Sequence, residues 1–279
     1  MLFGQAAGSS KPAAAPASSA KAPAAKVAAT KPDFSGVWKG RNQPLDFAHP
    51  DGPGVGTSGG WYGKARAGGG YGFQDSKMEP PVMLPWAADK FNKMRVGALP
   101  YMQPVKDVAP DINCVAGGFP YVMDLAMLVP FEIIQRPNKM IMLFGTDGHW
   151  REIFLDGRKN PEGAPNTFMG YSTGRWEGNT LVVETSGIND LNWLDRIGHL
   201  HTDELKVQER IYRVGADQIH FDFVFDDPKT YAKPWKGKKI YYLQKPGEEV
   251  LEEFTCEERW GAEFPEKLRK EIGDLKGPN

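Results

Sequence analysis

The sequence predicts an all-β domain in which an antiparallel up-and-down meander closes into a barrel or a strongly curled sheet. Short runs that alternate apolar and polar residues recur between residues 131 and 256. Turn residues separate most of these runs, and the short connections favour pairing between sequence neighbours. With one strand near Trp38 the meander has about ten strands. A meander of this length tends to close, because closure removes the exposed strand edges.

Composition limits the class of protein. The 279 residues are 41% hydrophobic and 11% aromatic, which is enough for a sizeable core. Basic and acidic residues number 34 and 35, so we expect no nucleic-acid partner. No apolar run approaches the roughly 20 residues of a membrane-spanning helix, so we expect no transmembrane segment. The sequence has no phosphate-loop or dinucleotide-binding glycine pattern, and it identifies no cofactor.

Residues 1–31 are predicted to be a disordered tether. They are rich in Ala, Pro and Ser and carry four lysines and no acid, a composition that cannot bury enough apolar surface to order itself. Residues 1–7 end in small residues, as a secretion signal does, but they lack its charged and apolar regions. Linkers of this kind are common on exported bacterial proteins, so we expect a periplasmic or extracellular location.

Residues 32–130 are predicted to form an irregular arm, rich in Gly and Pro, that contains the first strand. Gly36-Val37-Trp38 resembles the first-strand signature of lipocalins, whose tryptophan closes the base of the barrel. The resemblance implies a lipocalin-like barrel, and the alternative is an ordinary aromatic core anchor. Residues 40–72 concentrate glycine and aromatic residues, which favours an extended loop on the domain. Residues 85–96 begin with a proline and have helical spacing of their long side chains, which predicts one short helix.

Residues 131–261 are predicted to hold the rest of the meander in the same domain. The clearest signal is Glu177-Gly178-Asn179, which supplies the positive-φ residues of a tight hairpin. Residues 262–279 are predicted to be a charged helix, 262–275, followed by a tail. The predicted strands are 131–136, 140–145, 149–155, 172–177, 180–186, 205–214, 218–225, 238–243 and 250–256.

The chain resembles an uncharacterised family of exported bacterial proteins over roughly residues 33–260. The resemblance rests on the runs EIIQRPNKMIMLF, REIFLDGR, GYSTGRWEGNTLVVET, WLDRIGHLHTDELKVQERI and DDPKTYAKPW. It implies an exported β domain in which Cys114 and Cys256 belong to the ordinary pattern. It implies no activity and no catalytic residues.

Cys114 and Cys256 are the two cysteines of the chain. They are far apart in the sequence and form no Cys-x-x-Cys or Cys/His cluster, so they do not resemble a zinc site. The alternatives are one disulfide and two buried thiols. The expected export and the family pattern favour the disulfide.

The loop 187–204 concentrates polar and aromatic residues between two long strands, which is where a β scaffold usually carries its chemistry. His199 and His201 would share one side of an extended segment, and Asp195 or Asp190 could complete a metal site with one open position. The alternative is a set of ordinary hydrogen-bonding loop residues. We predict that this loop forms the functional mouth of the barrel, with both histidines directed at a shared polar site.

Glu209 lies on the apolar face of its predicted strand, together with Val207 and Ile211. A buried charge without a partner is too costly to persist, so Glu209 should either be paired or hold a raised pKa suited to acid–base catalysis. We predict a buried salt bridge with an arginine.

A ligand site is predicted from two further strands. His149 and Arg151 share one face of their strand, and Tyr171 and Arg175 share one face of theirs. If these faces meet inside the barrel mouth, together with Trp193 from the loop, the cluster could bind an anionic or oxygen-rich small molecule. The alternative is a solvated outer face.

Three functions follow from these observations. The preferred one is an exported β-barrel protein that binds a small, partly apolar ligand at the barrel mouth. The second is a cofactor-independent or metal-assisted lyase, isomerase or hydrolase that uses His199, His201, Asp195 or Glu209. The third is a structural or accessory subunit of a cell-envelope assembly, in which residues 1–72 contact a protein partner.

Overall fold

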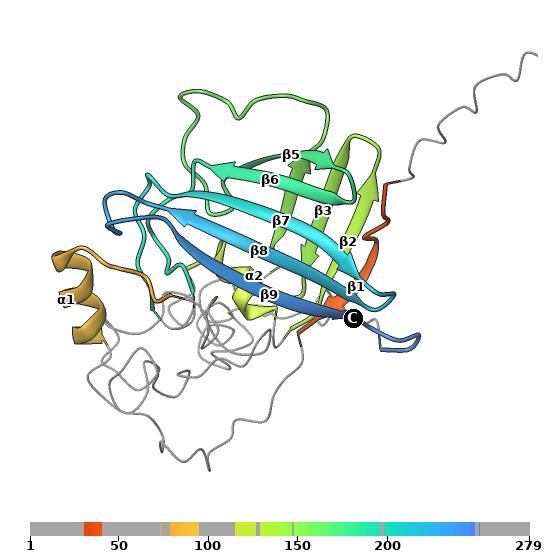
Figure 1. The fold of residues 1–279 in the computed structure, drawn as a ribbon, viewed down its shortest axis with the longest axis horizontal. Helices are drawn as coiled ribbons and strands as arrows, with labels where there is room; N and C mark the ends of the chain where they lie inside the picture. Colours follow the sequence, from red (N-terminus) through yellow and green to blue (C-terminus); the bar gives the residue numbers. More distant parts are fainter. Residues whose placement is uncertain are drawn as a thin grey trace, which may run out of the picture. The chain divides into compact units, whose positions relative to one another are not determined.

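Nine strands form one closed barrel in a computed structural model of the chain (Figure 1). The structure describes residues 31–40, 73, 79–94, 115–126, 129–146, 148–195, 198–248 and 251. The strands follow one another around the barrel in chain order, and the first strand pairs with the last to close it. The predicted all-β barrel is therefore confirmed.

The elements fall close to their predicted positions. The predicted helix at 85–96 is present as α1, whereas α2 lies in a stretch predicted to be irregular. The predicted helix at 262–275 falls outside the described residues, as do the predicted strand at 250–256 except for residue 251 and the arm at 40–72 except for residue 40. No described helix has both the length and the apolar character needed to cross a membrane. The elements are β1 (Gly36–Lys39), α1 (Pro85–Met94), α2 (Tyr121–Leu125), β2 (Phe131–Arg136), β3 (Lys139–Phe144), β4 (Trp150–Phe154), β5 (Tyr171–Glu177), β6 (Thr180–Ser186), β7 (Lys206–Val214), β8 (Gln218–Asp226) and β9 (Trp235–Leu243).

One pair of strands departs from the predicted antiparallel pattern. β4 and β5 run parallel, with Ile153 opposite Ser172 and Phe154 opposite Thr173. Two parallel neighbours need a connection that returns the chain to the end of the sheet from which it came. Residues 155–170 make that return, and this connection, unlike the tight turns, has no sequence signal that fixes its direction.

The hairpin between β5 and β6 forms as predicted. Glu177 pairs with Thr180 across a two-residue turn, and Gly178 has a φ of 59°. A Cβ at Gly178 would meet nothing within 4 Å, so glycine is favoured there by its backbone conformation and not by space.

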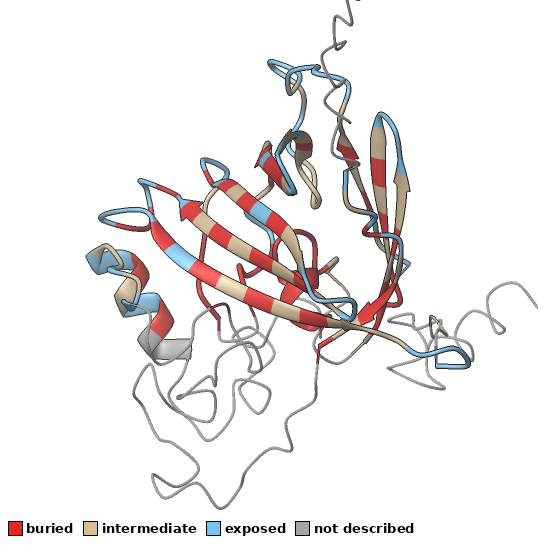
Figure 2. Ribbon diagram, turned by 45° about the vertical axis from the view of Figure 1, so that its right-hand side comes forward, coloured by how far each residue is buried: buried red, intermediate tan, exposed pale blue. Residues whose placement is uncertain are grey.

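Alternation along the strands fills the barrel with apolar side chains. On β8 the buried residues are Ile219, Phe221, Phe223 and Phe225, and the residues between them face outward. Figure 2 shows this alternation as bands along the long strands. Each large apolar side chain buried in this way contributes about 1.5–3 kcal/mol to folding.

The five residues of α2 are all buried. Two strand residues hold this helix: Lys239 forms an ion pair with Asp124, and the Tyr241 hydroxyl donates a hydrogen bond to the carbonyl of Met123. Burial raises the pKa of Tyr241 well above its usual value, so this hydroxyl remains a donor at all ordinary pH values.

Candidate functional site

Three segments meet at one end of the barrel: the loop 187–204, the connection between β8 and β9, and the segment 79–94 that contains α1. Met83 and Tyr231 form an isolated antiparallel bridge between the last two segments. Backbone hydrogen bonds of 2.8 Å flank the bridge, from Leu84 N to Thr230 O and from Ala232 N to Val82 O. These contacts fix α1 beside the barrel end.

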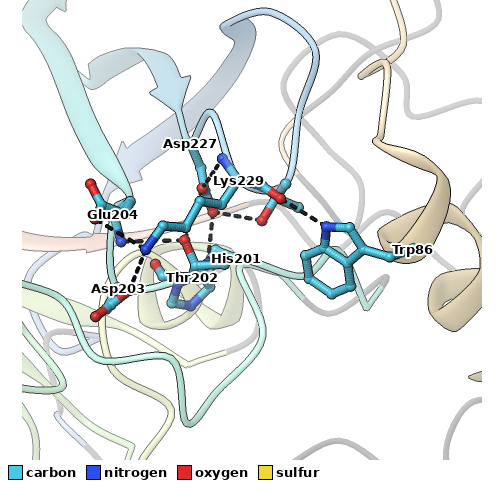
Figure 3. Close-up of polar contacts among 8 residues, drawn as sticks. Trp86, His201, Thr202, Asp203, Glu204, Asp227 and Lys229 are labelled. Carbon is cyan, nitrogen blue, oxygen red and sulfur yellow. Dashed lines mark hydrogen bonds and ion pairs between the residues drawn. The ribbon is translucent and has the colours of Figure 1, made fainter.

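The carboxylate of Asp227 ties the loop 187–204 to the β8–β9 connection (Figure 3). It accepts hydrogen bonds from the backbone N and the hydroxyl of Thr202, from the Thr230 hydroxyl at 2.7 Å and from Lys229 N at 3.1 Å. Asp227 is almost fully buried, so its carboxylate is shielded from water. Trp86 adds α1 to the same junction by donating from Nε1 to the Lys229 carbonyl at 2.8 Å.

Asp195 and His199 form a buried pair within the loop. His199 Nδ1 lies 2.6 Å from Asp195 Oδ2, and the His199 backbone N donates to Asp195 Oδ1. Burial alone would raise the pKa of Asp195, but the charge and hydrogen bonds of His199 outweigh burial and lower it. The imidazole stacks on Phe91 of α1 with ring centres 5.0 Å apart, and the ring of Trp235 lies 5.5 Å away.

His201 has different partners from His199. Its Nε2 lies 3.1 Å from Asn192 Oδ1 and its Nδ1 lies 3.2 Å from the Thr202 carbonyl, while the Asn192 amide also donates to the Gly117 carbonyl. Burial lowers the pKa of His201. The prediction that both histidines face one shared polar site is therefore wrong, because each is occupied in a separate buried contact.

The predicted metal site is not formed. Among the described residues, which include His199, His201, Asp190 and Asp195, no three His, Cys, Asp or Glu side chains are placed to hold a metal ion. Asp190 is exposed, whereas both histidines are buried. The extended conformation that would have aligned the two imidazoles is replaced by a loop that gives each ring its own partner.

The predicted burial and pairing of Glu209 are confirmed. Arg151 donates to both carboxylate oxygens of Glu209, from Nη1 at 3.0 Å and from Nη2. The same guanidinium donates to Ser172 and Thr185, and its central carbon lies 3.8 Å from the centre of the Phe119 ring. Both residues are at most 1% exposed. Glu209 therefore belongs to a buried hydrogen-bonded network inside the barrel.

The predicted ligand cluster on β4 and β5 is wrong, because the two faces point in opposite directions. Ile153 pairs with Ser172, so the inward face of Arg151 continues into Ser172 and not into Tyr171. The Tyr171 hydroxyl donates to the Pro165 carbonyl. Arg175 is exposed and pairs with Glu184 at 2.9 Å.

Two members of the predicted cluster lie elsewhere. His149 is half-buried and lies just before β4. Trp193 is buried within the loop, where its ring packs on Gly198; a Cβ at Gly198 would lie 3.6 Å from it. Trp193 therefore supports the loop, as do the two histidines.

A pocket of about 360 Å³ lies over β6, β7 and β8, at the strand ends that flank the loop 187–204. The connection 155–170 reaches it through Asn160, whose Nδ2 donates to Ser186 Oγ at 3.0 Å. None of the predicted site residues that the structure describes lines it. The lining residues are Asn160, Glu184, Thr185, Ser186, Lys206, Val207, Gln208, Val224, Asp226 and Pro234.

Comparisons with known proteins do not indicate a function for the chain. No family model, no curated protein and no solved structure matches the chain. The resemblance to exported bacterial proteins therefore stays a prediction. A barrel fold by itself hosts many functions, so the function of this barrel depends on its individual site residues.

The charges around the pocket are of two kinds. Glu184 forms an ion pair with Arg175, whereas Lys206 and Asp226 make no ion pair in the part of the chain that the structure describes. Lys206 and Asp226 are direct cross-strand partners on β7 and β8. The outward alternation of β7 could have identified Lys206 as a surface residue, but its position beside Asp226 and Asn160 depends on register and on the long connection. The pocket thus offers one cation, one anion and amide groups beside an apolar strip.

Proposed function

We propose that the protein binds a small, partly apolar molecule at the loop-bearing end of the barrel, in the pocket over β6, β7 and β8. The pocket itself is the observation that carries the proposal. Its volume of about 360 Å³ lies within the range of small-molecule sites, which is about 300–1,000 Å³. Val224 and Pro234 supply apolar surface, and Lys206, Gln208 and Asp226 supply groups that can orient a ligand.

The buried loop contacts support this proposal by positioning two walls of the pocket. Ser186 ends β6 and Lys206 begins β7, so the loop 187–204, followed by Leu205, joins the two strands. The Asp195–His199 pair lies within the loop, and Asp227 of the β8–β9 connection accepts a hydrogen bond from the backbone N of Thr202 in the loop. A binding wall held by buried hydrogen bonds loses little conformational entropy when a ligand arrives.

The test uses a substitution that fills the pocket and leaves the core residues unchanged. Val224 faces outward into the pocket, so Val224→Trp should occupy the space that a ligand needs. Val214→Trp is the matched control, because Val214 is exposed at the far end of β7. A fragment screen by ligand-observed NMR should give hits that Val224→Trp loses and Val214→Trp keeps. Hits that both variants keep, or a wild type that gives no hits, would exclude the proposal.

We also propose that the protein works in the periplasm or outside the cell, where Cys114 and Cys256 form a disulfide. The composition of residues 1–31, the family resemblance and the presence of two cysteines support this. Both cysteines lie outside the described residues, as does the arm that the assembly-subunit hypothesis uses. Closure of so long a loop would stabilise the fold by about 4 kcal/mol. Thiol titration of the unfolded, unreduced protein should find no free thiol; two free thiols would contradict the disulfide.

A second candidate function is acid–base catalysis by His199. The observation that favours it is the buried carboxylate of Asp195 at Nδ1, which orients the imidazole, while Nε2 makes no hydrogen bond among the described residues. Phe91 of α1 stacks on one face of the ring, and Nε2 lies at the ring edge. In a panel of model ester and elimination substrates, His199→Gln should abolish any turnover that the outward-facing control His220→Gln retains. A wild type without turnover removes this candidate.

A further inference from the structure

We infer that the ligand of the pocket is a small zwitterion, such as a free amino acid with an aliphatic side chain. This inference rests on the proposed function, because it names the ligand class of the same pocket. The ligand carboxylate would bind the ammonium group of Lys206, the ligand ammonium group would bind the carboxylate of Asp226, and the apolar part would lie on Val224 and Pro234.

The first support is the pair of opposite charges that the pocket presents. Lys206 and Asp226 face outward from directly paired positions, and both are exposed. Side chains at such positions have Cβ atoms about 4.5–5.5 Å apart, so both charged groups can reach one ligand. Neither of them makes an ion pair in the described part of the chain. An exposed pair between them would contribute only about 0.2–1 kcal/mol, so a ligand can replace it at little cost.

The second support is the set of partners that the other polar groups of the pocket have. The carboxylate of Glu184 pairs with Arg175 at 2.9 Å, which leaves Asp226 as the pocket carboxylate that has no cationic partner among the described residues. Asn160 Nδ2 donates to Ser186, and Asn160 Oδ1 is buried without a hydrogen-bond partner in the part of the chain that the structure describes. A buried amide group of this kind favours a polar ligand group at the site, whichever way the amide is turned.

The charge arrangement disfavours two simpler ligands. An anion without a cationic group would lie near Asp226 and Glu184 as well as near Lys206. A metal ion or a simple amine would meet the ammonium group of Lys206. Like charges brought close together oppose binding. A zwitterion avoids this, because it can place a group of opposite charge beside each of Lys206 and Asp226.

The experiment uses three probes of nearly equal size with the full chain. L-leucine carries both charges, L-leucine methyl ester carries only the ammonium group, and 4-methylpentanoate carries only the carboxylate. Isothermal titration and ligand-observed NMR should show leucine binding at least about tenfold more tightly than either analogue, because each analogue loses one charged contact.

Three variants locate the contacts. Lys206→Met removes the cation but keeps an unbranched side chain, and Asp226→Asn removes the anion at constant size. Each should weaken leucine binding by about tenfold or more. Lys245→Met is the matched control, because Lys245 is an exposed lysine beyond the end of β9 and outside the pocket; it should leave leucine binding unchanged.

The outcomes separate this inference from the proposed function. If leucine binds no better than its analogues, or if the two pocket variants bind it as the wild type does, the zwitterion inference is overturned. If leucine fails to bind while screened fragments still depend on Val224, the inference fails and the pocket remains a binding site. If no fragment binds either, both fail. Preferential leucine binding that is lost in both pocket variants establishes the inference.

Discussion

The inside of the barrel and the pocket on its outer face hold charge in opposite ways. Inside, Arg151 is bonded to Glu209 and Lys239 is bonded to Asp124. On the outer face, Lys206 and Asp226 lie directly opposite each other on β7 and β8 but form no ion pair with each other. The difference follows from solvent: a buried charge must be compensated, whereas water compensates an exposed one. Charged groups that can bind a ligand are therefore found on the outer face, whereas the sequence predicted a ligand site inside the barrel mouth.

The largest effect that tests this comparison is expected at Glu209. Glu209→Gln leaves the Arg151 guanidinium buried without a counter-charge, so the free energy of unfolding should fall by about 3–5 kcal/mol. Urea denaturation measures the change. Glu184→Gln is the control, because Glu184 is exposed and its pair with Arg175 is worth at most about 1 kcal/mol. Equal midpoints for the two variants would show that the interior pair is not shielded from water.

A smaller loss is expected at Tyr241. Tyr241→Phe removes the hydroxyl that donates to the buried Met123 carbonyl and leaves that carbonyl without this donor. An unsatisfied buried group costs about 1–3 kcal/mol. The control is Tyr212→Phe, whose half-buried hydroxyl accepts from Lys238 on the outer face. Thermal unfolding of both variants should rank Tyr241→Phe as clearly less stable; the reverse order would mean that α2 is not anchored by this bond.

Sequence reasoning succeeded where period-two alternation decides the outcome. Alternation placed Glu209 inside the barrel, and the Gly178 turn fixed the β5–β6 hairpin. It failed at β4 and β5, where a long connection sets both the direction and the register of the next strand. The register pairs Ile153 with Ser172, so Tyr171 and Arg175 lie on the opposite face from the one predicted. The pocket could not be predicted, because Asn160 reaches Ser186 only through the path of that same connection.

The burial of His201 predicts that the stability of the protein depends on pH. Burial lowers the pKa of His201 from 6.5, while Asp227 and Asp190 oppose the shift. Below about pH 6.5 the unfolded chain therefore binds a proton at this histidine that the folded chain does not bind. The free energy of unfolding should fall as the pH falls through this window, by at most about 1.4 kcal/mol per pH unit.

His201→Gln can keep a hydrogen bond to Asn192 but cannot titrate, so the slope of stability against pH between about 6.5 and 5 should become flatter. His220→Gln is the comparison, because burial and Lys238 also lower the pKa of that half-buried outer histidine; it should flatten the slope less. Asp195 acts in a separate window, since its pKa is lowered from 3.8 and its contribution is lost only at still lower pH. An unchanged slope in His201→Gln would mean that its ring is hydrated in the folded state.

The smallest stability effect is expected at Lys206, and the matched substitution at Lys239 makes it informative. Lys206→Met removes an exposed charge without an ion-pair partner in the described part of the chain, so the free energy of unfolding should change by no more than about 0.5 kcal/mol. Lys239→Met strands the buried carboxylate of Asp124 and should cost about 3 kcal/mol or more. Urea denaturation of the two variants compares one lysine inside the barrel with one outside it. A loss above about 1 kcal/mol for Lys206→Met would mean that Lys206 and Asp226 form a structural ion pair, and the pocket would then have no free charges to offer a ligand.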